Sequence, residues 1–505
     1  MVIPKRPNNE LSTLFILAFS GGGTRAASLS YGVLEELRRT EFTASDGQVR
    51  RLLDEVDVVS GVSGGSFTAL SYALYGDRLF DEYEQRFLKR DVQGELAKRS
   101  FLYPSNWFKL MGGNYGRSEI AAELYDEILF QGATFNDLLQ KSGPLALATG
   151  TDITTGSRFS FYQEDFDLLC SDLGPVQLSR AAATSSAVPI ALSPVTLNNY
   201  GGSCDYQYPP WVQDILTLDA NKRPAGRVLE RYRQMAEFHD GANRPYIHLV
   251  DGGVSDNIGA RGILDTFEEF FMSAAFREEK GFGVVRRIVF IVVNARSAHT
   301  RDWQKHESPP GSIKQLSQST GVPIERYSFE TVELIKDRAE VVDWRRRLLI
   351  AEAQLAGVPK AEAEARHPKI ETHVIDVNFE DLSDPEERAV IGHTIRAQGR
   401  VTQGFAALQP GDTLEVLLND GEPLNNVPKT AVEQGFAVPE RLVASMIDEF
   451  PILAVLAGAT WLAGSGVDRV RLVSRDGRIL LELVLATPAH PARDAENPVP
   501  PAFRP

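Results

Sequence analysis

Cysteine is scarce in this chain. Cys170 and Cys204 are the only two among 505 residues, too few for the disulfide framework of a small secreted domain. The pair therefore leaves the redox compartment of the protein open. No group of histidines and cysteines has the spacing of metal ligands, so we expect neither a metal site nor a cofactor.

Long apolar runs and a surplus of positive charge are also missing. No stretch reaches the roughly 18 apolar residues of a membrane-spanning helix. The net charge of −15 argues against nucleic acid as a partner, and against electrostatic docking on anionic lipid. We therefore expect any membrane contact to be peripheral, local and hydrophobic. With 43% hydrophobic and 24% charged residues, the chain suits one large domain plus a smaller one.

A Gly-x-Ser-x-Gly motif stands between an expected strand and an expected helix. Residues 55–60 are largely β-branched and predict a buried strand, and residues 66–74 have apolar side chains at helical spacing. Gly61 and Gly65 allow the sharp turn of a nucleophile elbow, which lifts the Ser63 hydroxyl above the sheet edge. The alternative is a plain tight turn, because five-residue patterns recur by chance.

A glycine-rich loop follows the first expected strand, residues 14–19, and precedes a helix. The loop consists of Gly21, Gly22, Gly23, Thr24 and Arg25. Its backbone N–H groups suit an oxyanion and a phosphate equally well. Ala26 takes the third glycine position of a dinucleotide fingerprint, which that fingerprint permits, so a nucleotide-binding module remains an alternative. The serine elbow one crossover later favours the oxyanion.

A third glycine motif follows the apolar strand expected at residues 246–251. The strand ends in Asp251, and Gly252 and Gly253 come directly after it. An aspartate in this position can hydrogen-bond the serine directly or orient a histidine, although an isolated Asp-Gly is usually a solvated turn. All three motifs follow strands, so we expect them to meet at the carboxyl edge of an α/β sheet.

Together these residues resemble the patatin-like phospholipase family. The resemblance implies a patatin-like three-layer α/β/α sandwich with a mostly parallel central sheet. It also implies a Ser–Asp dyad with Ser63 as nucleophile and Asp251 as base, and an oxyanion hole formed by the backbone of residues 21–25. The motif glycines Gly61, Gly65, Gly252 and Gly253 would support these groups. Ala26 departs from the family, which often has glycine there.

The resemblance extends over about residues 12–405 and includes the blocks 148–156 and 179–189. It implies a bacterial lipid acyl hydrolase of the phospholipase A or lysophospholipase type, acting on phospholipid or another lipid ester. The chain as written then predicts a cytoplasmic or peripheral membrane location. Related bacterial proteins often carry a lipoprotein signal at the N-terminus, and a missing native leader would make this a periplasmic lipoprotein. The oligomeric state is left open.

Histidine is the main challenge to a dyad, because ordinary α/β-hydrolases order their triad as serine, acid and histidine. His299, His306, His367, His373 and His393 all follow Asp251. None has a recognisable catalytic setting. His248 precedes Asp251 by three residues on the same expected strand, so it points to the opposite face of the sheet.

We expect a hydrolase domain over residues 12–408 with an insertion at 198–245, a small C-terminal region at 409–487 and a disordered tail at 488–505. Further elements expected are strands at 288–294 and 370–377 and a charged amphipathic helix at 329–356.

Two further segments each have two interpretations. Residues 438–457 resemble part of an enolpyruvylshikimate-phosphate synthase, with Asp448 at its catalytic position, so a fusion with residual transferase chemistry is a third alternative. A helix packed on a terminal hairpin, 469–473 and 478–485, is the plainer interpretation. In residues 101–111, seven of eleven side chains are aromatic or long aliphatic, which suits either a lipid-binding lid or ordinary core.

Overall fold

The computed structural model describes a defined part of the chain. The described residues are 9–44, 47–101, 115–141, 143–189, 192–208, 226–265, 281–296, 307, 312–378, 413–418, 467–473 and 479–484. Residues 1–401 and 402–505 form two separate units, and each is considered by itself. Asp448, the expected tail at 488–505 and all of the expected lid except the backbone of Phe101 lie outside the described residues.

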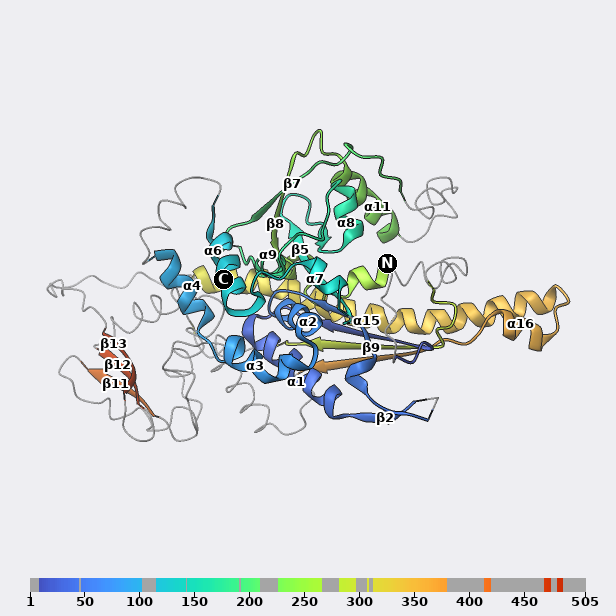
Figure 1. Ribbon diagram of the computed structural model, residues 1–505, viewed down its shortest axis with the longest axis horizontal. Helices are drawn as coiled ribbons and strands as arrows, with labels where there is room; N and C mark the ends of the chain where they lie inside the picture. The colour runs from blue at the N-terminus through green and yellow to red at the C-terminus, as the bar shows by residue number, and fades with distance from the viewer. Residues whose placement is uncertain are drawn as a thin grey trace, which may run out of the picture. The chain divides into compact units, whose positions relative to one another are not determined.

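The first unit is built on one mixed sheet (Figure 1). Within the described ranges it has eight strands, which run across the sheet as β10 (Glu371–Asn378), β9 (Arg287–Asn294), β1 (Thr13–Phe19), β4 (Val56–Gly61), β5 (Leu145–Asp152), β8 (Tyr246–Asp251) and β7 (Val195–Asn198), with β6 (Arg158–Ser160) paired to β5. The five strands from β10 to β5 are parallel to one another. The mostly parallel sheet that the sequence predicts is therefore present.

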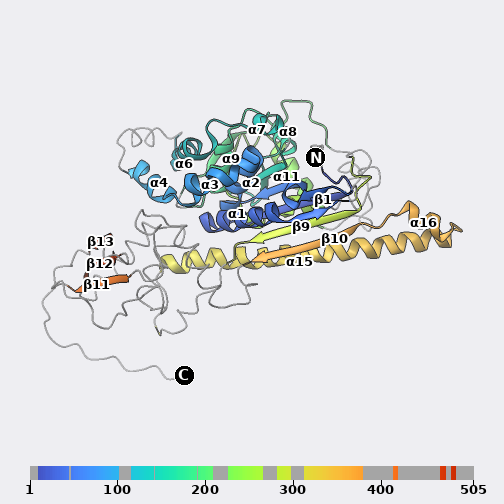
Figure 2. The same ribbon diagram turned by 60° about the horizontal axis from the view of Figure 1, so that its bottom comes forward.

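Helices cover both faces of this sheet. Their bounds are α1 (Gly23–Arg39), α2 (Gly64–Tyr75), α3 (Leu79–Tyr83), α4 (Val92–Phe101), α6 (Arg117–Tyr125), α7 (Phe135–Leu139), α8 (Gln163–Leu168), α9 (Leu178–Ser185), α11 (Gly226–His239), α12 (Gly253–Asp256), α15 (Ser312–Leu355) and α16 (Lys360–Arg366). Figure 2 shows α1 and α2 on one side of β1 and β9, and α15 on the other side. A separate small hairpin is formed by β2 (Glu41–Thr43) and β3 (Val49–Arg51).

The alternation of side chains in β1 explains the three layers. Phe15, Leu17 and Phe19 belong to the core under α1 and α2. Leu14, Ile16 and Ala18 belong to a second core, which includes Val332 and Ile335 of α15. Successive side chains of a strand point to opposite faces, and both sets are apolar, so each face of β1 is covered by a helical layer.

Two elements have features that the sequence patterns do not predict. Strand β8 runs antiparallel to β5, with Asp251 opposite Gly150, and an apolar strand pattern carries no information on direction. Gly61, at the end of β4, lies opposite Ala148 of β5, so Asp251 still ends at the carboxyl edge of the parallel strands, as the sequence predicts. Helix α15 begins 17 residues earlier than expected, at Ser312 rather than residue 329, because Gly321 and Pro323 interrupt its helical pattern.

The second unit contains a three-stranded antiparallel sheet. Its strands are β11 (Thr413–Leu418), β12 (Val467–Val473) and β13 (Ile479–Val484), in that order across the sheet. The pairing of β12 with β13 confirms the terminal hairpin that the sequence predicts.

Cys170 and Cys204 form a disulfide bond, which joins positions 34 residues apart. Cys170 follows α8, and Cys204 lies after β7 in the expected insertion. A backbone bond from Tyr200 N–H to Leu169 O, 3.2 Å long, accompanies the cross-link. The disulfide therefore ties the start of the insertion to the main sheet unit.

We expect reduction of this disulfide to lower the free energy of unfolding by about 3–4 kcal/mol, because a closed loop of this length restricts the unfolded chain. Urea unfolding with and without a phosphine reductant measures the loss. The double variant Cys170→Ser with Cys204→Ser serves as control, since its stability should not respond to the reductant. Equal stability of the wild type in both conditions would contradict the cross-link.

Candidate active site

Ser63 lies at the sharp turn between β4 and α2. Its backbone has φ 48° and ψ −121°, a conformation that non-glycine residues rarely adopt. Such strain costs about 1–3 kcal/mol and persists only where the surroundings enforce it. The enforcing bonds include Val62 N–H to Phe19 O at 3.0 Å and the Ser66 hydroxyl to Ser63 O at 2.6 Å. Ser63 is 7% exposed. The strand, sharp turn and helix that the sequence predicts around Ser63 are therefore present.

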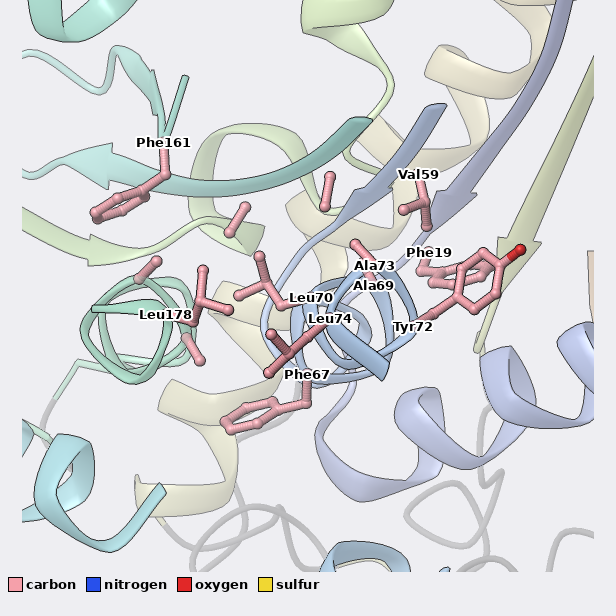
Figure 3. Close-up of a cluster of buried hydrophobic side chains, with 14 of the residues drawn as sticks. Phe19, Val59, Phe67, Ala69, Leu70, Tyr72, Ala73, Leu74, Phe161 and Leu178 are labelled. Carbon is pink, nitrogen blue, oxygen red and sulfur yellow. The ribbon is translucent and has the colours of Figure 1, made fainter. Parts of the chain in front are cut away.

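Helix α2 forms a rigid support for this turn. Phe67, Leu70 and Leu74 of α2 lie among buried side chains from the sheet and from α9 (Figure 3). Every residue of α2 from Gly64 to Leu74 is buried. Because a close-packed core resists displacement, the position of Ser63 follows from the packing of the helix that begins directly after it.

The elbow sits directly on the glycine-rich loop. A methyl group added at Gly64 would overlap the carbonyl oxygen of Gly23, and one added at Gly65 would lie 2.5 Å from the Phe19 oxygen. The Cβ position of Gly21 lies 3.4 Å from the Ser63 Cβ. The two motifs are therefore in van der Waals contact, as the prediction of a common site requires.

The backbone N–H groups of the loop differ in whether they already donate a hydrogen bond within the protein. Gly21 N–H donates to Asn257 O at 2.8 Å, so it is already occupied. Gly22 has φ 137°, which glycine tolerates best, and α1 begins at Gly23. The N–H groups of the first helical turn have no partner within their helix. The candidate anion-binding donors are thus the N–H groups of Gly22, Gly23, Thr24 and Arg25, rather than that of Gly21.

Asp251 lies at the end of β8 and is 6% exposed. Its Oδ1 accepts a hydrogen bond from Gly253 N–H at 2.7 Å. The Cβ position of Gly253 lies 3.0 Å from this oxygen and 2.9 Å from Asn257 Oδ1, and Asn257 also contacts Gly21. The Asn257 side chain therefore lies beside both the glycine-rich loop and Gly253, the residue that donates to the carboxylate.

Residues 185–187 connect Asp251 with Ser63. Ser63 N–H donates to Ser185 Oγ at 2.9 Å, and Gly252 N–H donates to Ser185 O at 3.2 Å. Asp251 N–H donates to Ala187 O at 2.9 Å. Neither Ser185 nor Asn257 could be assigned to the site from its sequence pattern. Ser185 lies in the block 179–189, and Asn257 lies in the segment just after Gly252 and Gly253.

Helix α15 supports the site from the second face of the sheet. Asn257 Nδ2 donates to Ser328 Oγ at 3.3 Å, and Arg261 Nε donates to Thr331 Oγ1 at 3.1 Å. Asp256, which directly precedes Asn257, accepts the backbone N–H of Arg261 at 2.8 Å, and its burial raises the pKa of this carboxyl. These bonds fasten the segment after Asp251.

Tyr125, at the end of α6, interacts electrostatically with Asp251. Burial raises the pKa of Tyr125 to about 12, and the negative charge of Asp251 acts in the same direction. The phenol therefore stays protonated near neutral pH and cannot act as the base of the site.

The described histidines have other surroundings. His248 is exposed, and its Nδ1 lies 3.0 Å from Thr196 Oγ1 on β7, in agreement with the predicted opposite face. His239 Nδ1 lies 3.1 Å from Leu168 O. His373 is on β10, and His367 follows α16. His299, His306 and His393 lie outside the described residues.

The described ranges contain no group of three or more His, Cys, Asp or Glu residues placed to hold a metal ion. In the same part of the chain, no helix has the length and apolar character needed to cross a membrane.

Residues 17–264 match the family model for patatin-like phospholipases. This segment, which contains Ser63, Asp251 and the glycine-rich loop, is a patatin-like phospholipase domain. This match supports a lipid hydrolase activity. It also agrees with the observed α/β fold, in which a mostly parallel sheet lies between helical layers.

Solved structures show weaker likenesses. Human GIVD cytosolic phospholipase A2 has 13% identity and a TM-score of 0.31, with 56% of this chain and 43% of that chain covered. The same human protein in complex with methyl gamma-linolenyl fluorophosphonate inhibitor and terbium chloride has 14% identity and a TM-score of 0.29, with 56% and 40% covered. TM-scores this low carry no argument about the present chain, which spans less than half of either structure.

A curated relative matches a short segment. The 3-phosphoshikimate 1-carboxyvinyltransferase of Hyphomonas neptunium is 54% identical over 54 residues, which are 10% of this chain and 12% of that protein. The match agrees with the second resemblance found in the sequence. A segment of this size does not carry over the activity of the whole enzyme.

We expect Gly64→Ala to lower kcat on a soluble ester by about 10²–10³-fold, the typical cost of losing one oxyanion-hole donor. The added methyl group overlaps the Gly23 oxygen, so the loop and the elbow must move apart. Steady-state kinetics with a p-nitrophenyl ester measures the loss. Gly32→Ala on α1 is the matched control, because nothing lies within 4 Å of its added methyl group. Full activity in Gly64→Ala would contradict the close contact of the two motifs.

Proposed function

We propose that this chain hydrolyses carboxylic esters of lipids, as a phospholipase A or a lysophospholipase, through a Ser63–Asp251 dyad. The observation that carries this proposal is the strained Ser63 at φ 48°, inside a segment that matches the patatin-like phospholipases. Strained backbone is often found at catalytic residues. The substrate partner is a phospholipid or another lipid ester, and contact with a membrane is peripheral.

The proposed reaction begins with proton transfer from Ser63 Oγ to Asp251. Ser63 Oγ then attacks the ester carbonyl, and the N–H groups of Gly22, Gly23 and the first turn of α1 stabilise the oxyanion. Asp251 returns the proton to the leaving alcohol, which departs and leaves an acyl-serine. Water next gives a proton to Asp251 and attacks the acyl group, and this proton finally returns to Ser63 as the fatty acid leaves.

An aspartate of ordinary pKa, about 4, is a weak base toward a hydroxyl. Asp251 is 6% exposed, and removal from water makes a carboxylate more basic. The bond from Gly253 N–H to its Oδ1 acts in the opposite direction, because it stabilises the charged form. The dyad therefore depends on exclusion of water once substrate fills the site.

The contact between the glycine-rich loop and the strained serine favours an oxyanion here over a bound nucleotide. Helices α1 and α2 both begin beside Ser63, at Gly23 and Gly64, and a helix N-terminus favours negative charge. The loop is in contact with a serine on a strained turn, for which nucleotide binding has no use. This contact favours hydrolysis over the nucleotide-binding alternative. The transferase alternative is less favoured, because it rests on a match to only 10% of the chain.

We expect Ser63→Ala to abolish ester hydrolysis while the melting temperature changes little, because the hydroxyl is held for chemistry rather than for packing. Hydrolysis of p-nitrophenyl esters and thermal unfolding measure the two effects. Ser71→Ala is the control, since Ser71 is a buried serine of α2 whose hydroxyl has no hydrogen-bond partner in the described structure. Turnover retained in Ser63→Ala would refute the assignment of the nucleophile.

Asp251→Asn should be nearly as damaging as Ser63→Ala, and the double variant should be little worse than either one, because residues that act as a unit lose most of their catalysis together. Kinetics of the two single variants and the double variant test this expectation.

Single His→Ala changes at 299, 306, 367, 373 and 393 provide the comparison for Asp251→Asn. Each should be mild in the same assay. A histidine change as severe as Asp251→Asn would replace the dyad with a triad.

A further inference from the structure

Ser63 and Asp251 lie at the ends of two strands that are not hydrogen-bonded to each other. Ser63 follows β4, Asp251 ends β8, and β5 lies between these two strands. Strand pairing alone therefore does not fix the distance between Ser63 and Asp251, which depends on the residues packed around them. A dyad needs this fit to be close, because proton transfer requires hydrogen-bond distance.

The C-terminal end of α9 supplies hydrogen bonds to both groups. The Ser185 hydroxyl accepts Ser63 N–H at 2.9 Å, while the Ser185 carbonyl accepts Gly252 N–H at 3.2 Å. Two residues later, Ala187 O accepts Asp251 N–H at 2.9 Å. Backbone carbonyls thus accept the N–H groups of Asp251 and Gly252, whereas a side-chain oxygen accepts the N–H group of Ser63.

The bond from Ser63 N–H to Ser185 compensates for the unusual turn. Ser63 precedes the first helical residue and has φ 48°, and its N–H is bonded to a side chain 122 residues away in the sequence. A buried N–H without an acceptor is unfavourable. The Ser185 oxygen therefore stabilises the strained orientation of the Ser63 peptide relative to relaxed alternatives.

We propose that Ser185 is a positioning residue, which orients the nucleophile toward its base through the Ser63 N–H. This inference rests on the proposed function, because it assigns Ser185 to the same dyad. Ser185 acts through Ser63 and has no chemical step of its own.

Ser179 provides a matched control on the same helix. Both serines belong to α9, and both are fully buried, at 0% exposure. The Ser179 hydroxyl has no hydrogen-bond partner within the described structure. Loss of a buried serine oxygen from α9 is thus common to Ser179→Ala and Ser185→Ala, whereas only Ser185→Ala removes a bond to Ser63.

The experiment compares wild type, Ser185→Ala, Ser185→Cys and Ser179→Ala. Steady-state kinetics on a soluble p-nitrophenyl ester separates kcat from KM, and a fluorophosphonate probe reports the reactivity of Ser63. We expect Ser185→Ala to lower kcat and the labelling rate together by about 10- to 100-fold, the range typical of a misplaced reacting group. KM should stay within about twofold, since a positioning defect acts mainly on the chemical step.

Ser185→Cys keeps the size of the side chain but offers only a weak acceptor. We therefore expect it to be impaired like Ser185→Ala, which distinguishes a lost bond from a lost volume. It also carries the test if Ser185→Ala does not fold. Ser179→Ala should keep kcat and labelling within about twofold of the wild type.

Three results would overturn the positioning role. They are wild-type labelling and kcat in both Ser185 variants, full activity in Ser185→Cys alone, and equal losses in Ser179→Ala and Ser185→Ala with lowered melting temperatures. A wild type that neither hydrolyses the ester nor reacts at Ser63 contradicts the proposed function itself, and the inference with it. A reactive wild type with unaffected Ser185 variants contradicts the inference alone.

Discussion

The left-handed backbone at Ser63 is the constraint on which the rest of the site depends. A serine at φ 48° and ψ −121° is unfavourable by itself, so the surrounding structure must stabilise it. The contact of Gly64 with the Gly23 carbonyl, the burial of α2 and the bond to Ser185 all act on this one residue. The turn places a hydroxyl next to a loop whose N–H groups can receive negative charge.

The support extends beyond the segment that matches the family. Residues 17–264 contain the motifs, yet Ser328 and Thr331 of α15 bond Asn257 and Arg261 from the other face of the sheet. Asn257 also contacts Gly21 and accepts its N–H through the backbone. The long helix thus stabilises the link between the aspartate motif and the glycine-rich loop. Catalytic groups of the proposed dyad are held from both helical layers.

Local patterns were enough to predict the elbow, the glycine-rich loop, the strands that precede them and the terminal hairpin, because each depends on spacing within a short segment. Long-range features were not predictable in this way. The bond from Ser63 to Ser185 spans 122 residues, and the direction of β8 depends on its neighbour rather than on its own residues. The pairing of Cys170 with Cys204 and the engagement of Gly21 N–H by Asn257 likewise depend on tertiary contacts.

The central claim is that Ser63 forms a covalent acyl intermediate. Rapid acid quenching during turnover of a p-nitrophenyl ester, followed by proteolysis and mass spectrometry, tests it most directly. The account predicts one acylated peptide, with the acyl group on Ser63, and none in Ser63→Ala. Acylation at another residue, or turnover that never yields an acylated peptide, would contradict it.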